Sequence, residues 1–141
     1  MRKSIKVLSA VVVVIAVLFT FAWPWIEMEF AGSAHYTEQD LREYNFYTPD
    51  ILKKMPRISP RYDFDFANIT GPATHVYAVK FYDTEDTRQI DAYLTSEGYQ
   101  RQGNCNIDNI CWHGKDPDET VMVSLMKSEI GVIVQVVYDF T

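Results

Sequence analysis

Two cysteines and a histidine form the closest set of reactive side chains in the last third of the chain. Cys105 and Cys111 are separated by five residues, and His113 follows Cys111 by two positions. Neighbouring cysteines in an exported domain favour a disulfide. In the chain-entropy model, a disulfide that closes so short a loop stabilises the fold by about 2–2.5 kcal/mol. The alternatives are free thiols or a zinc site, which needs a further ligand such as His35 or His75. We expect the disulfide, without a metal or cofactor.

Two groups of carboxylates could also carry chemistry. Asp63 and Asp65 alternate with aromatic residues, which places them on one strand face about 6.5–7 Å apart. Such a pair could perform acid–base chemistry on a sugar, but it is also typical of a solvent-facing polar edge, which we expect here. Asp116, Asp118 and Glu119 crowd one turn. The spacing of a helix–loop–helix calcium site is absent there, so we expect a solvated turn.

Motifs for nucleophilic catalysis and phosphate binding are missing from the sequence. The chain contains no G-x-S-x-G turn, and its six glycines are too scattered to build a phosphate loop. We therefore expect no catalytic residue and predict that the protein is not an enzyme.

The N-terminus predicts a membrane helix. Val7–Ile26 contains no charged residue and follows Arg2, Lys3 and Lys6. Twenty residues at about 1.5 Å per residue span roughly the 30 Å hydrocarbon core of a bilayer. Basic flanks remain in the cytoplasm, so the sequence predicts a single-pass inner or plasma membrane protein with a periplasmic or extracellular C-terminal domain.

A cleaved signal peptide is the alternative interpretation of this segment. Its cleavage site would follow Ala22, but no polar region precedes that residue and the apolar run is long for a signal. Trp23-Pro24-Trp25 instead indicates an aromatic anchor at the membrane interface. Both interpretations export the same domain.

The exported part is strongly acidic. All nineteen acidic residues follow position 26, together with ten of the thirteen basic ones, so residues 27–141 carry a formal charge of −9. Nucleic acids and anionic lipid surfaces are also negatively charged, so this charge disfavours both as partners. A basic protein partner remains compatible with this charge.

Periodicity along the chain predicts one α+β domain. After a stalk over residues 27–36, capping patterns predict short helices over 38–45 and from Pro49 to Lys54, and a main helix between Thr84 and Gly98. Alternating residues predict strands over 60–66, 75–82, 99–102, 110–113, 120–127 and 132–140. Short connections favour an antiparallel sheet with the main helix packed on one face, so the exported domain is expected to cover residues 37–141.

These features favour a protein-binding module held at the membrane, of the inhibitor or immunity-protein type. The expected contact residues are acids of the turn and aromatic side chains that a core does not need, since aromatic anchors dominate interfaces. They are Asp116, Asp118, Glu119, Trp112, Tyr44 and Tyr47. The alternative is a bitopic accessory subunit of a larger membrane complex, in which the apolar helix is itself a contact surface.

Overall fold

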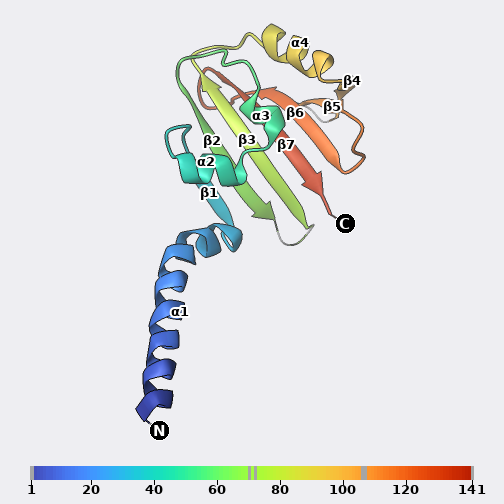
Figure 1. The fold of residues 1–141 in the computed structure, drawn as a ribbon. Coiled ribbons are helices and arrows are strands. Elements are labelled where there is room, and N and C mark those ends of the chain that lie inside the picture. Colours follow the sequence, from blue (N-terminus) through green and yellow to red (C-terminus); the bar gives the residue numbers. More distant parts are fainter. Residues whose placement is uncertain (1, 70, 72, 106–107, 141) are drawn as a thin grey trace. The chain divides into compact units, whose positions relative to one another are not determined.

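The computed structural model describes residues 2–69, 71, 73–105 and 108–140 (Figure 1). The chain divides into two compact units, Met1–Ala31 and Gly32–Thr141. The first unit consists mainly of helix α1 (Arg2–Glu29), which is long and apolar enough to cross a membrane. A signal sequence has the same properties, so the helix alone does not distinguish an anchor from a signal.

Within its described residues, the second unit is a seven-stranded antiparallel sheet with three helices. Its strands follow the order β1-β2-β3-β7-β6-β5-β4. The bounds are β1 (Ser33–Tyr36), β2 (Tyr62–Ile69), β3 (Thr74–Tyr82), β4 (Gln100–Asn104), β5 (Ile110–His113), β6 (Glu119–Leu125) and β7 (Gly131–Asp139). The helices are α2 (Leu41–Tyr47), α3 (Asp50–Lys53) and α4 (Arg88–Ser96).

One face of the sheet carries the hydrophobic core. Val134 pairs with Val79 on one side and with Val123 on the other, and all three side chains are almost fully buried. Successive side chains of a strand point to opposite faces, so Val132 and Val136 lie on this same core face. In Figure 1, α2 and α3 lie across the sheet over β2, β3 and β7.

The main helix packs as its sequence pattern predicts. Ile90 and Leu94 are fully buried, and Gly98 ends the helix with a positive φ of 90°. A left-handed residue after a helix is a usual position for glycine, because glycine has no Cβ to clash with the backbone. The α+β architecture and the antiparallel sheet are therefore confirmed.

Two predicted boundaries near the N-terminus are wrong. Residues 27–36 do not form a stalk, because 27–29 continue α1 and Ser33–Tyr36 pair with β2 as a sheet strand. The helix expected from position 38 begins at Leu41, and the backbone N–H of Thr37 donates to the carboxylate of Asp40 at 2.9 Å. A short edge strand has too few residues for its alternation to stand out in a sequence.

Candidate functional site

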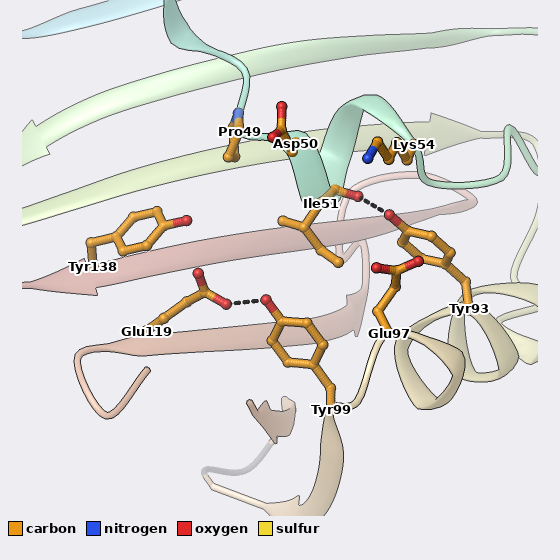
Figure 2. A pocket seen from close by; sticks show the side chains of 9 residues that line it. All are labelled: Pro49, Asp50, Ile51, Lys54, Tyr93, Glu97, Tyr99, Glu119 and Tyr138. Carbon is orange, nitrogen blue, oxygen red and sulfur yellow. Dashed lines mark hydrogen bonds between the residues drawn. The ribbon is translucent and has the colours of Figure 1, made fainter. Parts of the chain in front are cut away.

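A pocket of about 380 Å³ opens on the core side of the sheet, between α3, the end of α4 and strands β6 and β7 (Figure 2). Its lining combines tyrosines and carboxylates. The lining residues are Pro49, Asp50, Ile51, Lys54, Tyr93, Glu97, Tyr99, Glu119 and Tyr138. We refer to it as the tyrosine pocket.

The floor of the tyrosine pocket is the polar end of the core face. Glu119 and Tyr138 are paired across β6 and β7. Val121 and Val136 form the pair two residues closer to the middle of these strands, and both are fully buried on the same face. The core therefore ends where these two strands exchange valines for a carboxylate and a phenol.

The wall comes from the last turn of α4 and the residues that follow it. The backbone N–H of Tyr99 donates to the carbonyl of Leu94 at 2.9 Å, which turns the chain back toward the sheet after Gly98. In this position the Tyr99 hydroxyl donates a hydrogen bond to the Glu119 carboxylate, as Figure 2 shows. The helix end thus sets the position of one phenol over the floor.

The opposite wall is α3. The hydroxyl of Tyr93 donates to the backbone carbonyl of Ile51 at 2.8 Å (Figure 2). This bond joins α4 to α3 across forty-two residues of sequence. The helix α3 has only four residues, so it depends on such tertiary contacts more than on helix propensity.

Burial and carboxylates together keep the phenols protonated. Burial and then the charge of Glu97 raise the pKa of Tyr93 to about 12. Burial and then the hydrogen bond to Glu119 raise the pKa values of both Tyr99 and Tyr138 well above the usual range. The phenols are neutral donors at neutral pH, and the raised pKa values keep them protonated further into the alkaline range.

The charge balance of the tyrosine pocket favours a cation. Asp50, Glu97 and Glu119 contribute three carboxylates, against the single ammonium group of Lys54. Phenol rings also attract cations through their π faces. A lysine or arginine side chain, or another organic ammonium group, matches this combination of carboxylates and rings.

The acidic turn divides between this pocket and the solvent. Asp116 and Asp118 are exposed, and the backbone N–H of Asp118 donates to the Asp116 carboxylate at 2.9 Å. Glu119 begins strand β6, is partly buried and belongs to the tyrosine pocket. The sequence predicts one solvated turn for the three acids, and the structure gives them two different environments.

Two of the predicted aromatic contacts are core residues. Trp112 is 4% exposed and pairs across the strands with buried Val121. Tyr47 is 6% exposed and stacks on Phe66 with ring centroids 4.7 Å apart. Their expected place on a binding surface is wrong, because both rings fill the space between the sheet and the elements beside it.

Tyr44 is intermediate between core and surface. Its hydroxyl accepts a hydrogen bond from Arg57 at 3.0 Å, and its ring meets Phe64 edge-on at 5.3 Å. The same guanidinium also donates to the Leu52 carbonyl at 2.9 Å. Tyr44 thus helps to hold Arg57 at the end of α3, and its partly exposed ring is the remaining part available to a partner.

The cysteines and the aspartate pair lie outside the tyrosine pocket. Cys105 and Cys111 are at disulfide-bonding distance, with Cα atoms 5.7 Å apart, although residues 106–107 between them lie outside the described part of the chain. Asp63 and Asp65 share one face of β2, as predicted, but neither is a plain solvent edge. His35 from β1 lies beside both carboxylates.

The residues that sequence reasoning missed are the pocket tyrosines. Tyr93, Tyr99 and Tyr138 come from a helix, a helix end and the last strand, so no sequence spacing relates them. The available signal was local: Tyr138 and Glu119 each continue the inward-facing positions of a valine-rich strand. A polar residue at such a position can mark the end of a core or the floor of a site.

Comparisons of the chain with protein-family models, with curated proteins and with solved structures find no match. The candidate function consequently depends on the chemistry of the pocket and on the organisation of the chain.

Proposed function

We propose that this chain is a membrane-tethered protein-binding module, of the inhibitor or immunity-protein type. The tyrosine pocket is its recognition site and receives a lysine or arginine side chain of a basic partner. The supporting observation is the pocket lining, in which three carboxylates and three phenols face one ammonium group. The −9 formal charge of residues 27–141 acts in the same direction, since it steers a basic partner toward the domain.

In this proposal α1 is an uncleaved anchor with its N-terminus in the cytoplasm. Its support is the apolar helix, the basic residues at its start and the cysteine pair, which suits an oxidising exported compartment. A phosphatase reporter fused at the C-terminus should be active only after export. Reporter activity in the cytoplasm would contradict this topology, and a mature protein lacking residues 1–22 would show cleavage.

The pocket is tested by site-specific photo-crosslinking in native membranes. A photoreactive residue replaces Glu97, which is exposed at the pocket, or Gln89, which is exposed on the same helix but does not line it. We expect a protein adduct from position 97 and not from position 89. The adduct should weaken at least about tenfold in a Glu119→Gln background, because loss of one charge-assisted bond of about 1.5–3 kcal/mol corresponds to that factor. Equal adducts from both positions would reject the pocket.

Exchange of the anchor separates the two functional interpretations. Residues 2–26 are replaced by an unrelated apolar helix with the same basic flank, and the crosslink from position 97 is measured again. A recognition module keeps its adduct, because the exported domain makes the contacts. Loss of the adduct in a correctly exported variant would favour the accessory subunit, whose helix binds within the membrane.

A further inference from the structure

The opposite, open face of the sheet carries a second polar cluster, which the proposed recognition site does not use. His35 of β1 pairs with Asp65 of β2, and Asp63 of β2 pairs with Lys80 of β3. These positions alternate with buried Phe64, so their side chains point away from the core. One ligand atom from each of His35, Asp63 and Asp65 lies within 4.8 Å of the others.

Asp65 fixes the orientation of the imidazole. Its Oδ1 lies 2.7 Å from Nδ1 of His35, and its Oδ2 lies 2.9 Å from Nζ of Lys80. A carboxylate paired with an ammonium group is ionised and can only accept hydrogen bonds, so Nδ1 of His35 carries the proton and donates it. In the neutral imidazole the lone pair is then on Nε2.

The Asp63 carboxylate lies beside that lone pair. Its Oδ2 lies 3.8 Å from Nε2 of His35 and accepts a hydrogen bond from the Tyr82 hydroxyl at 2.8 Å. Its Oδ1 is buried, and no donor contacts it among the residues that the structure describes. The Asp63 carboxylate therefore accepts one hydrogen bond from a neutral hydroxyl at Oδ2, the oxygen that lies beside Nε2, and its lone pairs can also ligate a cation there.

We propose that His35 and Asp63 bind a divalent metal ion of the zinc type, with Asp65 as the positioning residue. Zinc–nitrogen and zinc–oxygen bonds of about 2.0–2.2 Å can bridge the gap between Nε2 and the Asp63 carboxylate. The series of contacts from Asp65 to His35 to the metal has the usual form, in which a ligating histidine donates its other N–H to a carboxylate. Water completes the coordination on the exposed side of His35, which is 61% accessible.

The chemistry of the ligands selects the metal class. Imidazole nitrogen suits zinc, copper and nickel, whereas calcium and magnesium prefer oxygen ligands throughout. Lys80 neutralises Asp65 and leaves Asp63 as the carboxylate available for direct ligation. Cys105 and Cys111 lie at disulfide-bonding distance of each other, so their sulfur atoms supply no thiolate ligand for zinc.

The experiment is titration of the full-length, detergent-solubilised protein with zinc chloride by calorimetry, with cobalt absorption spectra as a second readout of the ligands. We expect one zinc per chain. His35→Ala and Asp63→Asn should each weaken binding at least about tenfold, and Asp65→Asn should weaken it about 10–100-fold, as for other orienting partners. His113→Ala, on strand β5, is the matched control and should bind as the unchanged protein does.

Three outcomes would overturn the site: no zinc binding, unchanged binding in His35→Ala, or loss of binding in His113→Ala. Thermal unfolding of each variant without zinc checks that the fold is intact. Asp63→Asn retains a side-chain oxygen that can accept the hydrogen bond from the Tyr82 hydroxyl. Loss of zinc binding by this variant therefore reports the missing charge and not a missing hydrogen bond.

Discussion

The hydroxyl of Tyr93 donates a hydrogen bond to the backbone carbonyl of Ile51 at 2.8 Å. This bond joins α4 of the unit Gly32–Thr141 to the four-residue helix α3 and closes one side of the tyrosine pocket. It also gives a half-buried phenol a hydrogen-bond partner at the edge of the core. The relationship therefore connects the stability of the fold with the shape of the candidate site.

Tyr93→Phe should lower the free energy of unfolding by about 0.5–1.5 kcal/mol, which is the usual net value of one hydrogen bond. The ring remains in place, so the change reports the bond and not the packing. Urea denaturation of the full-length protein in detergent measures it, with exposed Gln89→Ala on the same helix as the control. A Tyr93→Phe protein as stable as the control would show that the bond contributes nothing.

Leu94→Ala should cost about 2–5 kcal/mol, because Leu94 is fully buried and truncation leaves a cavity in the core. Arg88→Ala should cost less than about 0.5 kcal/mol, since its ion pair with Asp86 is at the surface and its side chain is 89% exposed. Urea denaturation compares the two variants. If the two variants lost the same amount of stability, the side of α4 that faces the sheet would be assigned wrongly.

Reduction of the cysteine pair should destabilise the unit Gly32–Thr141 by about 2–2.5 kcal/mol, because Cys105 and Cys111 close a short loop with a sequence separation of six. Intact mass after non-reducing alkylation should show no free thiol. Cys105→Ser with Cys111→Ser should reproduce the loss seen on reduction. Two alkylated cysteines in protein purified from membranes would contradict the pairing.

Alkaline pH should destabilise the fold. Burial and then the charge of Glu97 raise the pKa of Tyr93 to about 12, and burial also raises the pKa of Tyr36 to about 12. Below about pH 10 these phenols are protonated in both the folded and the unfolded chain, so their contribution is fully present. Between about pH 10 and about pH 12 only the unfolded chain loses the protons, and stability falls.

Urea denaturation across that pH range, with tyrosinate absorbance as the titration signal, tests the alkaline effect. The part of the absorbance that belongs to Tyr93, taken as the difference between the unchanged protein and Tyr93→Phe, should rise together with unfolding rather than before it. Tyr93→Phe should reduce the slope of stability against pH, because one of the shifted groups is removed. A fold whose stability is independent of pH up to about pH 12 would exclude this linkage.

The acidic turn and the tyrosine pocket should affect different rate constants for the proposed partner. Asp116→Asn with Asp118→Asn should slow association and reduce its dependence on salt, because exposed charges steer encounter. Glu119→Gln should mainly speed dissociation, because this carboxylate lines the pocket. Surface-plasmon kinetics with the crosslinked partner, at low and high salt, separates the two. A salt-independent association rate would remove the steering role of the turn.

Local sequence patterns determined most of the secondary structure. The capping glycine at Gly98, the apolar positions Ile90 and Leu94, and the alternation of the last two strands all correspond to elements that the structure contains. These patterns are informative because each one reflects a local requirement: backbone conformation at a helix end, or burial of one face of an element. The close spacing of Cys105 and Cys111, together with the expected export of the domain, predicted their pairing, and the structure has them at disulfide-bonding distance.

Tertiary structure decided which side chains meet. His35 and Asp65 are thirty positions apart in the sequence, and Tyr99 and Glu119 are twenty positions apart. Only strand pairing and the helix end bring each pair together. It also decided that Trp112 and Tyr47 fill the core, since composition counts aromatic rings without assigning them to a face. The physical reason is that burial and site geometry depend on strand order and register, and these depend on contacts summed over the whole sheet rather than on local residue preference.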